Sequence, residues 1–192
     1  MSGSKKLKQK IGALLRKSGL KEEAFLARQT IENFHVRRYH TEFIHTDETV
    51  GEHTAGVLMF LIILDGDPSA NLMINALLHD FAEYYTGDSP FPAKRDFPAL
   101  KKILDKAETK YLADIGIVLP KITAEERLLL KAADMLQLCY KARKEIRMGN
   151  KDALYVLDNG LRHLEGLQWG CAHWGPKLET LIGDLRNERY NY

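Results

Sequence analysis

The sequence has little cysteine and no long hydrophobic run, and each absence excludes a class of protein. Only Cys139 and Cys171 occur among 192 residues, so a disulfide framework is excluded and reduced thiols are expected. The longest apolar run, VLMFLIIL at 57–64, is far shorter than the roughly 18 residues that span a bilayer. The apolar stretch IGALL near the N-terminus runs straight into Arg-Lys and is too short for a secretory signal. We therefore expect a cytoplasmic protein without a membrane anchor.

The net charge is also small, at +2, but it is unevenly distributed along the chain. Residues 1–40 contain ten Lys or Arg and three Glu, a charge of +7, which leaves −5 for the remainder. A basic segment of this kind can contact nucleic acid or the acidic face of a neighbouring subunit. The simpler interpretation, which we prefer, is the solvated face of a helix, so nucleic acid is not an expected partner.

Strand-like alternation is absent too, and helical periodicity runs through nearly the whole chain. The length fits one domain, which we predict to be all-α: a compact bundle of about seven to nine helices with its core at about 34–165. A helical extension at 1–33 and a C-terminal helix in 166–192 flank this core. The predicted helices occupy residues 5–18, 21–36, 48–64, 68–85, 98–116, 122–148, 152–167 and 176–190, and a loop with Gly and Pro occupies 86–97. The helix at 48–64 is apolar all round at its centre and is predicted to be buried.

Polar side chains interrupt three of these helices at core-facing points: His53 in GEHTAGV, His79 and Asp80 after NALL, and Asp134 in LLLKAADMLQL. Taken singly, each has a structural explanation, such as a hydrogen-bonded core histidine or an Asp134 carboxylate that pairs with Lys131. Taken together, two imidazoles and two carboxylates form a mixed nitrogen and oxygen ligand set. That set suits one divalent metal ion, Co²⁺, Mn²⁺, Zn²⁺ or Fe²⁺ with Mg²⁺ as an alternative, and leaves room for a metal-bound water.

Two more carboxylates follow the His-Asp pair. Glu83 lies four residues after His79, so a continuous helix would place both side chains on one face, where Glu83 could move a proton of the water. Asp88 follows Gly87 in a loop that can fold back over the same site. Read alone, Glu83 is a surface carboxylate of a last helical turn, and only the neighbouring His-Asp pair favours a catalytic role.

The segments that hold these residues resemble a known family. They are RRYHTEFIHTDETVGEHT (37–54), LLHDFAEYYTGDSPFPAK (77–94) and KAADMLQLCYKARKEIRMGN (131–150). They look like the HD-domain metal-dependent phosphohydrolases, in particular the YfbR-type 5′-deoxynucleotidases and the DatZ-type dATP triphosphohydrolases of phages. The resemblance covers about residues 34–155, and HDxxExxTGDxPxPxK is its most specific motif.

The resemblance implies an enzyme that hydrolyses 2′-deoxynucleotides at the 5′ α-phosphorus with a metal-bound water. A monophosphate would give deoxynucleoside and phosphate, and a triphosphate such as dATP would give deoxynucleoside and triphosphate. The residues implied by position are His53, His79, Asp80 and Asp134 for the metal, Glu83 and Asp88 for catalysis, and Arg38, Tyr39 and Lys94 for substrate. The resemblance also implies a homo-oligomer, either a dimer or a hexamer. If a phage encodes the protein, the expected location is the cytoplasm of the host.

One position departs from the family. The bacterial enzymes carry Trp after the phosphate-binding arginine, whereas this chain has Tyr39, so the selection of deoxyribose over ribose stays open, and packing in the core is the alternative for Tyr39. Two other functions also stay open: an HD phosphohydrolase of cyclic nucleotides or alarmones, and a non-catalytic helical module that binds nucleic acid or a partner. The deoxynucleotidase-like loop argues against the first, and the intact ligand set argues against the second.

Overall fold

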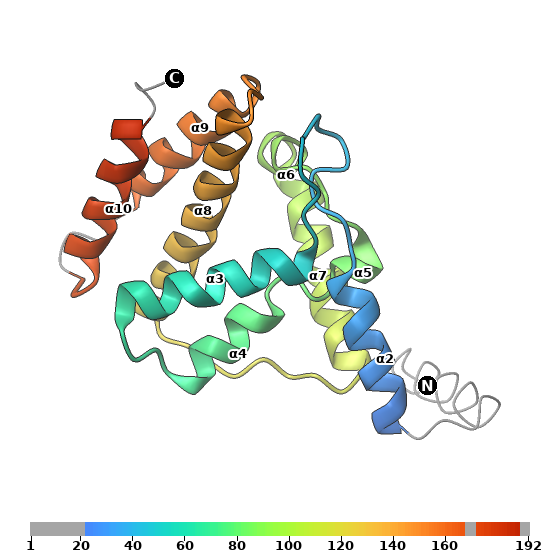
Figure 1. Ribbon diagram of the computed structural model, residues 1–192. Coiled ribbons are helices and arrows are strands. Elements are labelled where there is room, and N and C mark those ends of the chain that lie inside the picture. Colours follow the sequence, from blue (N-terminus) through green and yellow to red (C-terminus); the bar gives the residue numbers. More distant parts are fainter. Residues whose placement is uncertain (1–21, 168–171, 189–192) are drawn as a thin grey trace. The chain divides into compact units, whose positions relative to one another are not determined.

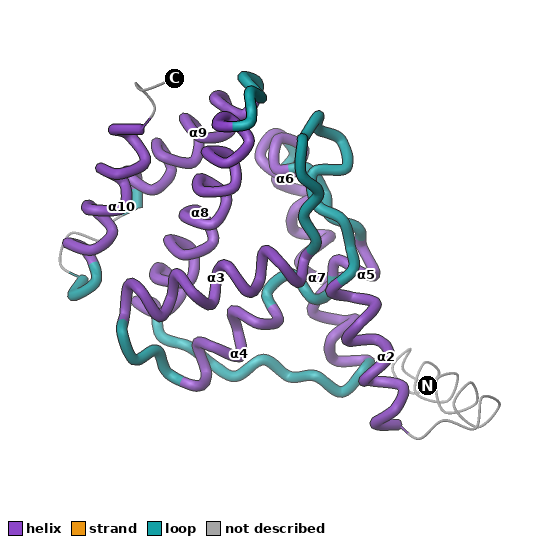
Figure 2. Tube along the Cα trace, viewed as in Figure 1, coloured by secondary structure: helices purple, strands orange, loops and turns teal. Residues whose placement is uncertain are grey.

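The computed structural model describes residues 22–167 and 172–188, and within these ranges the regular elements are helices (Figures 1 and 2). An isolated β-bridge joins Arg37 and Thr49. The helices are α2 (Glu22–Phe34), α3 (Val50–Asp65), α4 (Ala70–Leu78), α5 (Glu83–Thr86), α6 (Phe91–Asp96), α7 (Pro98–Asp114), α8 (Ala124–Arg147), α9 (Ala153–Gly166) and α10 (Gly175–Glu188). The prediction of an all-α protein is confirmed. The helix predicted at 5–18 lies outside the described residues.

The chain packs as two compact units. The described part of the first unit comprises residues 22–38, 49–51 and 80–119, and it contains α2, α5, α6 and α7. The second unit comprises 39–48, 52–79 and the described residues after 119, and it contains nearly all of α3 together with α4, α8, α9 and α10. In the described part of the chain, no helix is both long enough and apolar enough to cross a bilayer.

In the second unit, α8 packs on α4, α9 and α10. A capping box starts α8: the Thr123 hydroxyl accepts from the Glu126 backbone N–H at 3.1 Å, and the Glu126 carboxylate accepts from the Thr123 N–H at 2.7 Å. The apolar core around this helix includes Leu129, Leu136, Leu157, Leu164, Trp174 and Leu178. Burial of these side chains holds in place the helix that carries Asp134.

The second unit also contains most of α3, and only one side of this helix is buried. The residues on the buried side include Val57, Leu61 and Leu64. On the other side, Met59, Ile62 and Ile63 are 56%, 41% and 45% exposed. The prediction that the helix is buried all round is therefore wrong, because helical periodicity shows where apolar side chains lie but not which of them a neighbouring element covers.

The helix predicted at 68–85 is interrupted at the His-Asp pair. α4 begins after Ser69, whose hydroxyl accepts from the Leu72 N–H, and it ends at Leu78. Residues 79–82 form a turn, and the Glu83 N–H bonds to the Asp80 carbonyl three residues back, at 3.0 Å. The expectation that His79 and Glu83 share one face of a continuous helix is therefore wrong.

The loop predicted at 86–97 contains a short helix, α6, in the first unit. Pro90 is its N-cap and Pro92 lies in its first turn, where a missing N–H costs no helical hydrogen bond and the fixed φ of proline suits the helix. The prediction that Gly and Pro exclude regular structure from 86–97 is therefore wrong for residues 91–96, because prolines at these positions start a helix. Gly87, with φ of 77°, ends α5 and turns the chain toward α6.

Aromatic contacts link the helices of the first unit. Phe34 at the end of α2 meets Phe81 edge-on, with ring centroids 5.7 Å apart. Tyr85 of α5 stacks on Tyr111 of α7, with centroids 5.3 Å apart. These contacts position the segment that carries Asp80, Glu83 and Asp88.

Candidate metal centre

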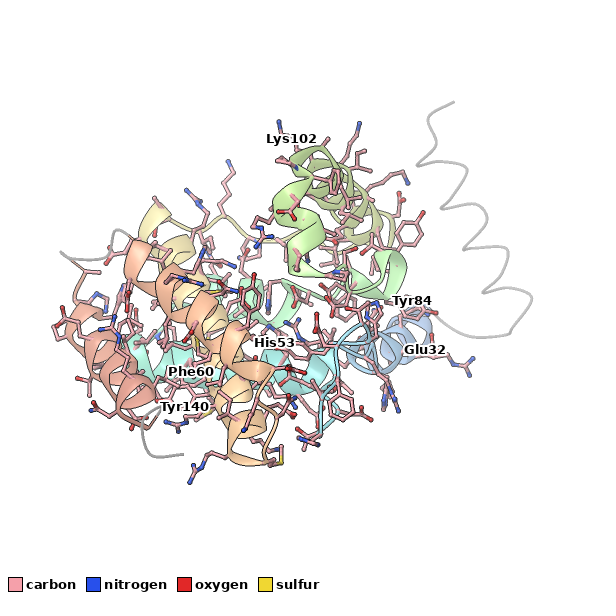
Figure 3. All side chains as sticks on the ribbon, turned by 90° about the horizontal axis from the view of Figure 1, so that it is seen from above. Glu32, His53, Phe60, Tyr84, Lys102 and Tyr140 are labelled. Atoms are coloured by element: carbon pink, nitrogen blue, oxygen red, sulfur yellow. The ribbon has the colours of Figure 1, made fainter. Side chains whose placement is uncertain are left out.

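Two histidines and an aspartate meet within the second unit. His53 projects from α3 and is fully buried (Figure 3), and His79 caps the end of α4. The Nε2 atoms of the two rings are 3.2 Å apart, and His53 Nε2 lies 3.3 Å from Oδ1 of Asp134 on α8. Three separate helices thus bring three of the four predicted metal ligands together. The fourth, Asp80, directly follows His79 in the chain.

The Nδ1 atoms identify the tautomer of each histidine. Nδ1 of His53 lies 2.6 Å from the side-chain carbonyl oxygen of Gln137, and Nδ1 of His79 lies 2.7 Å from the backbone carbonyl oxygen of Ala76. A carbonyl oxygen only accepts, so each Nδ1 carries the hydrogen and each neutral ring presents a lone pair at Nε2. Two lone pairs and a carboxylate oxygen at this separation repel each other unless a proton or a cation lies among them. The donor set therefore fits a divalent metal ion.

Asp134 has the charge that a metal ligand needs. Burial by itself raises the pKa of this carboxyl, but the neighbouring His53, Lys131 and His79 outweigh burial, so the pKa lies well below its usual value. Lys131 Nζ binds Oδ2 at 2.9 Å, whereas Oδ1 faces His53. Asp134 can therefore pair with Lys131 through one oxygen and bind a metal ion through the other, so the two interpretations of this residue are compatible.

In the first unit, Glu83 stands at the start of α5 and is only 5% exposed. Burial, together with the negative charges of Asp80 and Asp88, raises the pKa of Glu83 to about 9, although Arg38 and Lys94 act in the opposite direction. In the cation-free protein, Glu83 therefore holds a proton at neutral pH. Five of the predicted site residues thus form one electrostatic neighbourhood in the first unit, in which the other four affect the pKa of Glu83: Arg38, Asp80, Glu83, Asp88 and Lys94.

The two cations predicted to bind phosphate belong to this neighbourhood. Arg38 Nη1 donates to Asp80 Oδ2 at 2.7 Å. Lys94 lies on α6, close enough for its charge to lower the pKa of Glu83. Guanidinium and ammonium groups bind phosphate oxygens, and the carboxylates beside them can hold a proton or a cation.

Tyr39 belongs to the second unit and has a φ of 57°, in the left-handed region that few residues other than glycine adopt. It lines a pocket of about 70 Å³ together with Phe43 and, from α8, Lys141 and Glu145. The predicted metal ligands of this unit do not line that pocket. A contact of Tyr39 with the sugar stays a prediction.

Two polar residues behind His53 were missed by sequence reasoning. Gln137 on α8 accepts from His53 Nδ1, and its own Nε2 donates to Oε1 of Glu48 at 2.8 Å. Gln137 follows Asp134 by three residues on the same helix face and interrupts leucines as Asp134 does, so the signal that identified Asp134 was also present there. Glu48 lies in the irregular segment before α3, and no pattern in the sequence distinguishes it.

The fold is that of the HD-domain phosphohydrolases. The cyanophage S-2L HD phosphohydrolase DatZ, solved with dA and one catalytic Zn²⁺ ion, gives a TM-score of 0.61 at 19% identity over 82% of this chain and 96% of that one. A conserved hypothetical protein from Pyrococcus furiosus gives 0.59 at 21% identity over 84% and 98%. An HD-domain phosphohydrolase from Listeria innocua gives 0.54 at 16% identity over 83% and 95%.

The family follows from the sequence match. The model of the YfbR-like 5′-deoxynucleotidase family matches residues 28–170, well over half of the chain. This chain therefore belongs to the YfbR-like 5′-deoxynucleotidase family, and the expected resemblance is confirmed. A relative from Enterobacter sp. (strain 638), a 5′-deoxynucleotidase, is 31% identical over 56% of this chain. The match spans 65% of that relative, just under two thirds of its length.

Proposed function

We propose that this protein is a metal-dependent phosphohydrolase that cleaves 2′-deoxynucleotides at the 5′ α-phosphorus. Beside the family, one observation supports this: the Nε2 lone pairs of His53 and His79 face each other at 3.2 Å beside the ionised Asp134. Asp80, next to His79 in the family motif, is proposed as the fourth ligand. These residues would hold a divalent ion, Co²⁺, Mn²⁺, Zn²⁺, Fe²⁺ or Mg²⁺, which would lower the pKa of a water molecule and offset phosphate charge.

The residues of the first unit are proposed to move protons and to bind phosphate. Glu83 holds a proton because its pKa is raised to about 9. A divalent charge held near its neighbour Asp80 would lower that pKa, and Glu83 could then release and regain the proton. Asp88 is proposed to protonate the 5′ oxygen of the departing deoxynucleoside. Arg38 and Lys94 are proposed to hold the phosphate oxygens, whose negative charge must be stabilised in the transition state.

The family favours a monophosphate as the substrate, with deoxynucleoside and phosphate as products. Hydrolysis of a triphosphate needs the same attack on the α-phosphorus and additional cations for the outer phosphates. Arg95 is half exposed and already paired with Asp96 at 2.7 Å. Of the two α6 cations, Lys94 is therefore better placed to bind an outer phosphate. Tyr39 is proposed to contact the sugar and to disfavour a 2′-hydroxyl.

A product assay tests the proposal. Purified protein would be incubated with deoxynucleoside and ribonucleoside mono- and triphosphates in the presence of each metal, and the products separated by chromatography. We expect deoxynucleoside and phosphate from the deoxynucleoside monophosphates. Triphosphate released from a deoxynucleoside triphosphate would place the protein with the triphosphohydrolases, and no product with any metal would contradict the proposal.

A matched pair of histidine variants ties the activity to the centre. His79→Ala removes a proposed ligand and is expected to abolish both hydrolysis and metal binding while circular dichroism stays helical. His173→Ala is the control, because His173 is 59% exposed and its ring nitrogens lie 3.4 Å from a carboxylate oxygen of Asp65 and 3.6 Å from one of Glu125. Equal activity of both variants would contradict the assignment of His79.

A homo-oligomer, either a dimer or a hexamer, is also proposed, and a cytoplasmic location stays a prediction. Exposed apolar side chains on two helices of the second unit support self-association: Met59, Ile62, Ile63, Ile74 and Leu77. Light scattering of the wild type is expected to show the oligomer, and Ile62→Glu is expected to dissociate it. A monomeric wild type would contradict this part of the proposal.

A further inference from the structure

A buried carboxylate reaches the His53 ring through an amide. Glu48 and Gln137, which are 6% and 9% exposed, form a chain in which Gln137 Nε2 donates to Glu48 Oε1 at 2.8 Å and Gln137 Oε1 faces His53 Nδ1 at 2.6 Å. We infer that Glu48 and Gln137 are positioning residues that hold His53 in the Nδ1–H tautomer and thereby set its affinity for a divalent cation. The inference rests on the proposed metal centre.

Glu48 determines which end of the Gln137 amide faces the histidine. A carboxylate oxygen only accepts, so the NH₂ group of Gln137 turns toward Glu48 and the carbonyl oxygen turns toward His53. With the amide reversed, an N–H would face Nδ1, and the ring would carry its hydrogen on Nε2. A ring in that tautomer has no lone pair at the atom that faces His79 and Asp134.

The same chain increases the affinity of His53 for a cation. The Glu48 carboxylate polarises the amide, and the polarised carbonyl oxygen draws the Nδ1 hydrogen, which makes Nε2 a better electron-pair donor. Histidine ligands of metals usually donate their second N–H to a carboxylate or a carbonyl group, and loss of that partner weakens metal binding by roughly 10- to 100-fold. Here an amide joins the carboxylate to the ring.

Gly56 provides the space that Gln137 occupies. A β-carbon at residue 56 would lie 2.7 Å from Cγ of Gln137 and 3.5 Å from its Nε2. Residue 56 lies within α3, one turn after His53. Glycine is a poor helix former compared with alanine, so the helix by itself does not favour glycine there. A larger residue there would displace Gln137 from the ring without removing any hydrogen-bonding group.

Three variants test the inference. Gln137→Met keeps the shape of the side chain and removes its carbonyl, Gly56→Ala pushes the amide away, and Gly183→Ala in α10 is the control, because a β-carbon at 183 has no neighbour within 4 Å. Zn²⁺ affinity would be measured by competition with a chelator, and the His53 tautomer by ¹⁵N NMR of the metal-free protein. Both readouts are independent of hydrolysis.

The wild type is expected to show the Nδ1–H tautomer of His53. Gln137→Met is expected to lose that preference and to bind Zn²⁺ roughly 10- to 100-fold more weakly, with a smaller loss in Gly56→Ala and none in Gly183→Ala. If Gln137→Met binds Zn²⁺ within about threefold of a Zn²⁺-binding wild type, the inference is overturned and the metal centre stands. If Gln137→Met does not fold, Gly56→Ala decides, and affinity equal to that of Gly183→Ala overturns the inference. A wild type that binds no divalent cation overturns the proposed function and the inference together.

Discussion

Arg38 donates a 2.7 Å hydrogen bond to Asp80, 42 residues later in the chain. Arg38 is one of the two proposed phosphate-binding cations and Asp80 is a proposed metal ligand, so in the cation-free state each neutralises the other. A divalent cation at Asp80 would compete with Arg38 for the carboxylate and make the guanidinium available to phosphate. We therefore expect metal binding and substrate binding to be coupled.

Arg38→Gln tests this coupling. Removal of the guanidinium is expected to lower kcat/KM by about 100-fold, because a charge that binds the transition state is lost. The same change should leave metal affinity unchanged or increase it, because Asp80 no longer has a competing cation. Titration with Mn²⁺ and steady-state kinetics would be measured together, with Arg162→Gln, an exposed arginine of α9, as the control. A parallel loss of metal affinity and activity would indicate a structural role for Arg38.

The raised pKa of Glu83 predicts a pH dependence of stability in the metal-free protein. The folded pKa of about 9 exceeds the ordinary value of 4.5, so the folded state binds the proton more tightly. The stabilisation is complete below pH 4.5 and is lost as the pH rises toward 9, by up to about 1.4 kcal/mol per pH unit. Urea unfolding at several pH values from 6 to 9 is expected to show that the free energy of unfolding falls less steeply with pH in Glu83→Gln than in wild type.

Glu83→Gln is also expected to lower kcat by about 100-fold or more, because an amide cannot transfer the proton. The matched control is Glu179→Gln, an exposed position of α10, which should change neither the pH slope nor kcat. If the free energy of unfolding depends on pH equally in Glu83→Gln and in wild type, the Glu83 carboxyl of the wild type is already ionised at pH 7.

Glu145 of α8 is expected to stabilise the segment that contains Tyr39 and Thr46. Burial by itself raises the pKa of this carboxyl, but hydrogen bonds from Thr46, from the His45 N–H at 2.6 Å and from Asn150 lower it to about 2. Because the folded pKa lies below 4.5, the stabilisation is present above pH 4.5 and is lost as the pH falls toward 2. Glu145→Gln is expected to cost on the order of 3 kcal/mol at pH 7.

Urea unfolding at pH 7, 5 and 3 would measure this effect, and the difference between Glu145→Gln and wild type should shrink at pH 3. Glu165→Gln removes a carboxylate that is 38% exposed and paired with Arg186, and it should change stability by less than about 1 kcal/mol at each pH. A constant difference across the three pH values would argue against ionisation of Glu145 as the cause.

The close approach of α8 and α9 depends on a glycine. A β-carbon at Gly160 would lie 2.5 Å from Sγ of Cys139 and 3.2 Å from a methyl carbon of Leu138. Gly160→Ala is therefore expected to destabilise the protein by about 1–3 kcal/mol through overpacking. In the double variant with Cys139→Ala, the sulfur is absent and part of that loss should be recovered, which a double-mutant cycle of thermal unfolding would show. Strictly additive effects would contradict the contact.

Sequence reasoning found His53, His79 and Asp134 because each is a polar residue where the helical pattern calls for an apolar one, and burial of such a group needs a partner. The structure brings these three together. The same reasoning failed at residues 79–82, where periodicity continues although the helical hydrogen bonds stop, and at α6, where prolines begin a helix. It did not find Gln137, because a single amide among leucines has many explanations until its partners are known.

The sequence by itself determined the helical class, since periodicity is a local property, and it determined the family through a motif of fixed spacing, HDxxExxTGDxPxPxK. Only the tertiary structure decided which side of α3 is covered, which nitrogen of each histidine carries the hydrogen, and that Glu48 orients Gln137 toward His53. These depend on contacts between residues as far apart in the chain as 48 and 137. Hydrogen-bond direction and burial are properties of such contacts, so no local pattern of residues can specify them.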